Sequence, residues 1–297
     1  MFGLGILVKG GSGGPPPSLA KAYLVGGWTP FGHYQNTTHE YDPSGDVWTE
    51  KATFETGRNY LAGTDILGKG YVSQGMKVGN SWDRETNEYS PDTWVTKTPA
   101  LITAYSIQLT ASTILNKGYF YGGQNVNYCN EYDPDTWTAK TNMTANRGEA
   151  GSCTILDKGY VFCGFSGTDW TTPTVTVYEY SPDTWTARTS APTPARTSTR
   201  AATINNKGYI FGGFTSTQAK ITDTDEYTPT STWVSKTNMP VAISAGSVVA
   251  INNKAYYMSG FSADALWSLE TFEYDPDTFT AKQVMTVGHD YGTAFAI

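Results

Sequence analysis

The sequence predicts an all-β fold built from repeats, and three observations support this prediction. Residues 131–140, EYDPDTWTAK, place Tyr and Trp on either side of an Asp-Pro-Asp-Thr turn, which reads as a β-hairpin. Versions of it recur six times, with spacings of 48, 43, 48, 47 and 47 residues, and a period in the forties is typical of repeat architectures. Aromatic residues make up 14% of the chain and charged residues only 16%, which suits sheets packed face to face. The hairpin tyrosines are Tyr41, Tyr89, Tyr132, Tyr180, Tyr227 and Tyr274.

The repeat fills the chain from residue 20 to 297, so we expect a single domain there. The net charge of −7 argues against a nucleic-acid partner, because phosphate binding needs a basic face. No apolar run approaches the length of a membrane helix, so we expect no membrane insertion. The apolar residues 1–8 have no basic residues before them and make a poor signal peptide.

Residues 1–19 are predicted to form a flexible, Gly- and Pro-rich N-terminal arm. Residues 10–14 are a flexible glycine-rich stretch, and residues 15–17 are a short stiff run of prolines. Two interpretations stay open: a disordered terminus, or an apolar tip that docks on a protein partner. The docking residues would be Phe2, Leu4, Ile6 and Leu7. Short apolar, glycine-rich openings of this kind are similar to those of some tailed-phage structural proteins.

The three cysteines, Cys129, Cys153 and Cys163, have no metal-binding spacing and cannot all pair. Cys153 and Cys163 flank the turn at residues 156–159, so they could face each other across a hairpin. The alternative that we favour is two half-buried thiols. No metal and no cofactor are expected.

Each repeat reads as four strands, A to D. Strand B has the pattern Tyr-apolar-apolar-Gly-Gly, strand C ends at Glu-Tyr, and strand D begins at a Trp or, once, at Phe279. Strand A follows, as at residues 151–156, and a tight turn such as 116–118 leads into the next strand B. The six B strands are expected at residues 23–27, 71–75, 119–123, 160–164, 209–213 and 256–260.

These motifs resemble the kelch repeat, and the resemblance covers residues 20–297. Some copies depart from the pattern: residues 73–75, 163–164 and 259–260 lack the first glycine of the pair. The resemblance implies a six-bladed kelch-like β-propeller. The first strand B has no strand A before it, and residues 292–297 read as a strand A with no strand B after it. The C-terminal strand is therefore expected to complete the first blade and close the ring. The resemblance to kelch propellers that close in this way implies that the completing strand is the innermost one.

Charged residues recur with the repeat and are interpreted first as structural. Six lysines of the A–B turns would form a ring on one face: Lys21, Lys69, Lys117, Lys158, Lys207 and Lys254. Aspartates of the C–D turns lie on the same face and would largely neutralise this ring: Asp46, Asp92, Asp135, Asp183 and Asp277. Glutamates before the strand-C tyrosines, such as Glu131, should pair across strands with basic residues of strand D, such as Lys140.

The B–C and D–A loops share the opposite face, and the B–C loops vary among otherwise regular repeats. Rigid scaffolds carry binding residues on such loops. Aromatic and polar residues there suit a sugar ring or a protein partner, although they could also simply cover the sheet ends. They are Trp28, Phe31, His33, Tyr34, Trp82, Arg84, Tyr128, Trp170, Phe214, Phe261 and Trp267.

A second candidate column lies at the entry to strand A. It contains Arg58, Arg147, Arg196 and His289, with Ser106 and Ile243 at the two other positions. In kelch domains that bind acidic peptides, arginines near this entry face the ligand, so the resemblance implies that role here. The alternative is that these residues cap strand ends and bond loop carbonyls.

Enzyme signatures are sparse. The chain has only three histidines, His33, His39 and His289, and no nucleophile elbow or phosphate-binding loop. We therefore predict a non-enzymatic binding or structural module. Its expected setting is a virion or surface appendage, anchored by the arm, with the loop face turned to a host glycan or protein. The alternatives are an intracellular adaptor for an acidic peptide and a secreted glycan-active enzyme.

Overall fold

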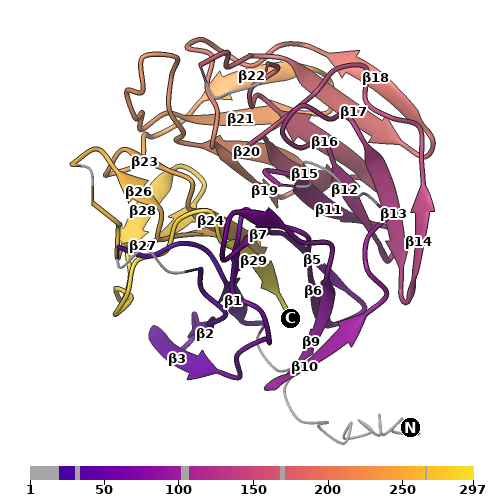
Figure 1. The fold of residues 1–297 in the computed structure, drawn as a ribbon. Helices are drawn as coiled ribbons and strands as arrows, with labels where there is room; N and C mark the ends of the chain where they lie inside the picture. Colours follow the sequence, from indigo (N-terminus) through magenta and orange to yellow (C-terminus); the bar gives the residue numbers. More distant parts are fainter. Residues whose placement is uncertain (1–19, 31–33, 102–106, 168–170, 265) are drawn as a thin grey trace, which may run out of the picture.

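The computed structural model describes residues 20–30, 34–101, 107–167, 171–264 and 266–297. The predicted arm at residues 1–19 and its docking residues lie outside these ranges. Within them the chain is all-β, and no helix is present that could cross a membrane. Most of the strand residues among them belong to six four-stranded antiparallel sheets (Figure 1).

The six sheets are numbered here in chain order and their strands are given from strand A to strand D. Sheet 1 holds β29 (Thr293–Ala296), β1 (Ala22–Val25), β2 (Thr38–Asp42) and β3 (Val47–Lys51), and sheet 2 holds β5 (Ala62–Ile66), β6 (Lys69–Ser73), β9 (Thr86–Ser90) and β10 (Thr93–Lys97). Sheet 3 holds β11 (Thr110–Ile114), β12 (Lys117–Tyr121), β13 (Cys129–Asp133) and β14 (Thr136–Ala139), and sheet 4 holds β15 (Gly151–Ile155), β16 (Lys158–Phe162), β17 (Val177–Ser181) and β18 (Thr184–Arg188). Sheet 5 holds β19 (Arg200–Ile204), β20 (Lys207–Phe211), β21 (Thr224–Thr228) and β22 (Thr232–Ser235), and sheet 6 holds β24 (Ser247–Ile251), β25 (Lys254–Met258), β27 (Thr271–Asp275) and β28 (Thr278–Ala281). Two small sheets form in the loops: β4 (Arg58–Asn59), β7 (Met76–Lys77) and β8 (Ser81–Trp82) make one, and β23 (Ile243–Ser244) and β26 (Phe261–Ser262) make the other.

The prediction that the end of the chain completes the first sheet is confirmed. β29 pairs antiparallel with β1, with Phe295 opposite Tyr23. The pairing extends to the backbone of Lys21, whose N–H donates to the carbonyl of Ile297 at 2.9 Å. Figure 1 shows β29 in yellow between β1 and β5 in indigo, so the last strand lies against the first ones. The first sheet is therefore held together by residues from both ends of the described chain.

The A strands of neighbouring sheets contact one another in sequence. β5 contacts β11, β11 contacts β15, β15 contacts β19, and β19 contacts β24. β29 contacts both β24 and β5. Hydroxyl groups satisfy backbone carbonyls across these contacts: Ser152 Oγ donates to Ala111 O at 2.7 Å, and Thr154 Oγ1 donates to Thr113 O at 2.5 Å. The Ser and Thr residues of the A strands thus bond the unpaired edges of neighbouring A strands.

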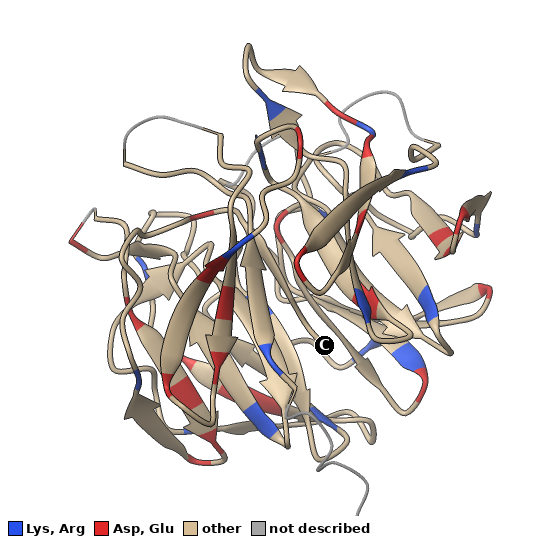
Figure 2. Cartoon of the chain, turned by 90° about the horizontal axis from the view of Figure 1, so that it is seen from below, with Lys and Arg blue, Asp and Glu red and all other residues tan. Residues whose placement is uncertain are grey.

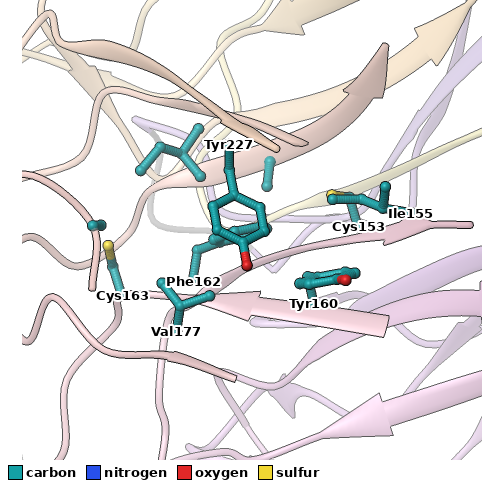
Figure 3. Packing of buried hydrophobic residues seen from close by; sticks show 10 residues of the cluster. Cys153, Ile155, Tyr160, Phe162, Cys163, Val177 and Tyr227 are labelled. Carbon is teal, nitrogen blue, oxygen red and sulfur yellow. The ribbon is translucent and has the colours of Figure 1, made fainter. Parts of the chain in front are cut away.

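Aromatic and aliphatic side chains fill the space between sheets. Between sheets 4 and 5, Ile155, Phe162 and Val177 pack with Tyr227 (Figure 3). The ring centroids of Phe162 and Tyr227 lie 5.6 Å apart. Five of the six hairpin tyrosines share such packing with the Trp of their own strand D, as Tyr132 does with Trp137 at 4.8 Å. The repeated Tyr and Trp of the sequence are therefore core residues between sheets.

The three cysteines are free and buried, not half-buried. In the ladder Cys153 stands opposite Tyr160, while Cys163 lies one residue beyond the end of β16. The two thiols therefore do not face each other across the hairpin. Burial raises the pKa of the Cys153 thiol to about 12 and that of the Cys163 thiol to about 11.

The turn aspartates have a different role from the predicted one. They do not neutralise the lysines; each accepts a hydrogen bond from a backbone N–H just after strand D of the preceding sheet, as Asp92 Oδ1 does from Ala52 N at 2.8 Å. The indole N–H of the strand-D tryptophan donates to the carbonyl of that same residue, as Trp94 Nε1 does to Ala52 O at 3.0 Å. The remaining aspartate bonds are Asp46 with Gln283, Asp135 with Thr98, Asp183 with Thr141 and Asp277 with Thr237.

The lysines of the A–B turns are neutralised by the strand-C glutamates. Glu88, for example, lies 2.6 Å from Lys69 and 3.2 Å from Lys97, and accepts from the hydroxyl of Tyr71 at 2.7 Å. Burial raises the pKa of this carboxyl, but its lysine and tyrosine partners outweigh that effect and hold the pKa below its usual value. All six sheets repeat the arrangement, which confirms the predicted pairs between strands C and D. Figure 2 shows these basic and acidic residues side by side on neighbouring strands.

Candidate functional site

The candidate site is built on the residue that lies two positions before each strand A. In all six sheets this residue has a positive φ, between 50° and 62°, in the left-handed region that non-glycine residues rarely adopt. Because the conformation recurs in every sheet, it belongs to the architecture, and only the identity of the side chain differs. We call these residues the entry ring: Tyr60, Gln108, Glu149, Ser198, Ala245 and Tyr291.

Backbone hydrogen bonds join the members of the entry ring. Ser198 N donates to Glu149 O at 2.9 Å, and Ala245 N donates to Ser198 O at 3.0 Å. The same bond links Glu149 to Gln108, Tyr291 to Ala245 and Tyr60 to Tyr291. The side chains are therefore carried on backbone that is fixed from one sheet to the next, which suits a preorganised binding site.

Glu149 is the acidic member of the entry ring, and its side chain is buried. Gln108 Nε2 donates to Glu149 Oε1 at 2.6 Å, and the hydroxyl of Ser198 donates to Oε2. Burial raises the pKa of the Glu149 carboxyl above its usual value, and the hydrogen bonds from Ser198 and Gln108 offset only part of that effect. The carboxyl is thus able to carry a proton nearer to neutral pH than an exposed glutamate.

The entry ring borders a cavity between the A strands. The cavity has a volume of about 110 Å³ and is lined by Tyr60, Gln108, Glu149, Arg200 and Tyr291. Arg200 is held in place by backbone carbonyls: its Nε donates to Gly246 O at 2.5 Å and one terminal nitrogen donates to Thr199 O at 3.0 Å. A cation and a carboxyl group therefore line one polar cavity.

A second acidic group lies beside this cavity, at the junction of the first and last parts of the chain. Burial raises the pKa of Asp290 to about 7, while the indole N–H of Trp267 opposes that shift. The backbone of Asp290 pairs with Trp28, with N–O distances of 2.8 and 3.0 Å. Two residues of the predicted binding loops thus contact Asp290, Trp28 through its backbone and Trp267 through its indole N–H.

The other predicted loop residues lie at different degrees of exposure. Tyr34 packs edge-on against Trp28 at 4.8 Å and donates to Asn80 Oδ1 at 2.6 Å. Trp82, on β8, and Tyr128 are 41% and 36% exposed, and Arg84 is exposed as well. Phe261 packs against Trp267 at 5.5 Å. The loop residues Phe31, His33 and Trp170 and the column residue Ser106 lie outside the described residues.

The arginine column is buried, and two members take the structural role that was the alternative. Arg58 is fully buried and donates to Glu85 O at 2.8 Å and to the side chain of Asn87. Arg196 donates to Asp223 O at 3.2 Å and forms a buried ion pair with Asp225. Their guanidinium groups are therefore occupied by loop carbonyls and by a side chain of strand C in the same sheet.

The remaining members of the column follow the same pairing rule. Arg147 lies over the ring of Tyr178 at 5.4 Å, and His289 packs edge-on against His39 at 5.0 Å. Tyr178 and His39 occupy the strand-C position that Asn87 and Asp225 hold in their sheets. Each of these four column residues is thus matched to the second residue of strand C in its own sheet. A comparison of the column position with the second position of strand C across the repeats could have predicted from the sequence which residues pair.

The sequence analysis did not predict the entry-ring residues as site residues, nor Arg200 and Asp290. Tyr60, Gln108, Glu149, Ser198, Ala245 and Tyr291 all lie two residues after the column that was predicted, so a search two residues further along would have found them. Among the described residues, no group of three or more His, Cys, Asp and Glu side chains could hold a metal ion.

Comparison with known proteins identifies a similar fold but no family. A scan against family models and a search of curated proteins found no match. Among solved structures, the structure of YjhT is similar, with a TM-score of 0.72 and 14% sequence identity over 84% of this chain and 91% of that chain. At this identity the likeness shows a shared all-β fold.

Proposed function

We propose that this chain is a six-bladed kelch-like β-propeller. Three features support the proposal: the six four-stranded sheets among the described residues, the contacts of A strands from β5 round to β24 and β29, and the pairing of β29 with β1. In this interpretation the cavity beside the entry ring is one end of the central channel. A second cavity of about 230 Å³, lined by Asp65, Thr113, Thr154 and Thr203, is its other end.

We propose further that the propeller is a non-enzymatic binding module whose ligand lies on the face formed by the B–C and D–A loops. The single observation that carries this proposal is the cavity beside the entry ring, which brings Glu149 and Arg200 together where the D–A loops lead into the A strands. Its volume of about 110 Å³ equals roughly four waters and is well below that of a typical ligand pocket. It would therefore hold one end of a ligand, while the rest lies over Trp28, Trp267 and Trp82.

A glycan fits this arrangement better than an acidic peptide. Sugar hydroxyl groups can both donate to a carboxyl and accept from a guanidinium, and sugar rings pack on aromatic faces. The acidic-peptide alternative needed free arginines, and Arg58 and Arg196 are already bonded. A protein ligand that inserts a polar side chain remains compatible with the same cavity. Display on a virion or surface appendage stays a prediction.

The test is a glycan array with the full chain and two variants. Glu149→Gln keeps the size of the side chain that fills the cavity wall, and Trp82→Ala removes an exposed loop aromatic. We expect binding that both variants weaken, by about tenfold or more for Glu149→Gln if a hydrogen bond to the carboxylate is lost. Lys158→Ala, in an A–B turn, is the control and should bind as the parent chain does. Binding that Lys158→Ala abolishes and Glu149→Gln leaves intact would refute this site.

One observation favours a second candidate function, a glycan-active enzyme. Glu149 and Asp290 both have raised pKa values, and the charge of Glu149 contributes to the shift at Asp290. Paired carboxyl groups with raised pKa values are suited to general acid–base catalysis. Turnover of a bound sugar, lost in Glu149→Gln and in Asp290→Asn with binding retained, would establish this function in place of the first.

A further inference from the structure

Three A–B turns have an exposed leucine at a position where the turn conformation favours Asn, Asp or Gly. Leu67, Leu115 and Leu156 are 73%, 64% and 60% exposed, among the most exposed large apolar residues of the described chain. Each has a positive φ, of 51°, 48° and 49°. Bulky residues rarely adopt this conformation, and hairpin turns with two positive φ values favour Asn, Asp or Gly.

The chain itself shows the favoured choice in the next two sheets. Asn205 and Asn252 occupy the same position with φ values of 50° and 52°. The backbone conformation is thus the same in all five turns, and only the side chain differs. Leucine is unfavourable here for two reasons: its backbone is strained at a positive φ, and its side chain exposes apolar surface to water. The three leucines follow the A strands of sheets 2, 3 and 4, which are consecutive neighbours, so their turns succeed one another on one face; we call the three residues the leucine arc.

The residues before β1 begin on the same face. Lys21 N bonds Ile297 O, so Ala20 stands where sheet 1 would have its own A–B turn. The A strand of sheet 1, β29, contacts β5 of sheet 2, which leads into the turn of Leu67. Nineteen residues precede Ala20, and residues 2–8 among them contain five apolar side chains and no charge.

We propose that residues 2–8 of this chain dock on the leucine arc of the same molecule. The eleven residues 9–19 join this apolar segment to Ala20. A flexible linker of that length has a root-mean-square span of about 18 Å, which the stiff, extended proline run at residues 15–17 does not shorten, and packed sheets lie about 10 Å apart. The segment therefore reaches the turns of sheets 2 and 3, and its own length extends to sheet 4. Docking buries the three leucines against Phe2, Leu4 and Ile6, which offsets the unfavourable turn conformation.

Photo-crosslinking from position 2 tests the proposal. The photoreactive residue p-benzoylphenylalanine is incorporated in place of Phe2 in the full chain at low micromolar concentration. We expect crosslinks within a single molecule, mapped by mass spectrometry to the turns at Leu67, Leu115 or Leu156. The triple variant Leu67→Asn, Leu115→Asn, Leu156→Asn should reduce their yield at least fivefold. Because Asn already serves in sheets 5 and 6, this variant should fold, with an unchanged far-UV circular dichroism spectrum and an equal or higher Tm.

The matched control is Leu266→Asn, which removes a leucine of similar exposure, 63%, from a B–C loop. It should leave the crosslinks unchanged. Crosslinks that map elsewhere, that survive in the triple variant or that do not form at all would overturn the proposal. Crosslinks between two molecules would overturn it as well and would assign the leucine arc to a second copy of the chain.

Discussion

Asp46 Oδ1 accepts a hydrogen bond from Gln283 N at 2.8 Å, although 237 residues separate the two in sequence. Asp46 lies in the turn after strand C of sheet 1, and Gln283 follows strand D of sheet 6. The indole N–H of Trp48 donates a hydrogen bond to the carbonyl oxygen of the same Gln283 at 3.0 Å. The first and last sheets are therefore joined by the same pair of bonds that joins neighbours along the chain.

Asp46→Ala should destabilise the protein by about 0.5–1.5 kcal/mol, because it removes the acceptor that the N–H of Gln283 and the hydroxyl of Tyr41 share. Urea unfolding measures the change. Asp92→Ala removes the equivalent bond to Ala52 between sheets 1 and 2 and is the matched comparison. The two losses should agree within about 1 kcal/mol, since the two bonds join equivalent positions of neighbouring sheets. No loss in either variant would show that the bonds do not contribute to stability.

Phe295→Ala should cost about 3–5 kcal/mol, the usual range for truncating a buried Phe. Phe295 is buried in β29, stacks on Tyr23 at 5.5 Å and contacts the ring of Tyr89 at 5.9 Å. Phe295→Leu should recover more than half of the loss. Thermal unfolding followed by circular dichroism measures both. Equal stability of the parent chain and Phe295→Ala would mean that β29 is not part of sheet 1.

His289 should make the protein sensitive to acid. Burial and the neighbouring His39 lower the pKa of His289 to about 4, so the folded state binds its proton less tightly than the unfolded state. Stability is therefore lost as pH falls from about 6.5 to about 4, by on the order of 3 kcal/mol from this group alone. His289→Gln keeps a donor for the carbonyl of Gly26 and does not titrate.

The measurement is the difference in unfolding free energy between the parent chain and His289→Gln from pH 7 to pH 4. Using the difference cancels the contribution of Asp290, whose raised pKa gives the opposite slope in this range. His39 also has a pKa lowered by burial and adds to the effect in both proteins. A difference that stays constant over this range would contradict the assignment.

Glu149→Gln should stabilise the protein at pH values where the carboxyl is ionised. Its pKa is raised in the folded state, so its stabilising contribution is present at low pH and is lost as pH rises through the folded pKa. The variant keeps the hydrogen bond from Ser198 or Gln108 and carries no charge at any pH. Its Tm should match the parent at pH 4 and exceed it at pH 8. A lower Tm at pH 8 would indicate that the carboxylate is stabilised by Arg200.

Glu40 with Lys51 illustrates what could be predicted without coordinates. Their pairing, like the strand order within each repeat, depends on neighbours in one hairpin, and hairpin neighbours follow from alternation and turn residues. The arginine column was found for the same reason, because a repeat can be aligned to itself. Its burial could not be predicted, since it depends on how the chain before strand A packs against Asn87 and Asp225 of strand C in the same sheet.

The sequence by itself determined the six repeats, the four strands in each, the pairing of β29 with β1 and the core role of the Tyr and Trp residues. These follow from local turn chemistry and from a period that the chain repeats. Only the tertiary structure decided that Asp46 bonds Gln283, that Glu149 and Arg200 line one cavity, and that Asp290 lies near enough for their charges to act on its pKa. Those contacts join sheets that are distant in sequence, and their distances depend on how the sheets pack against one another.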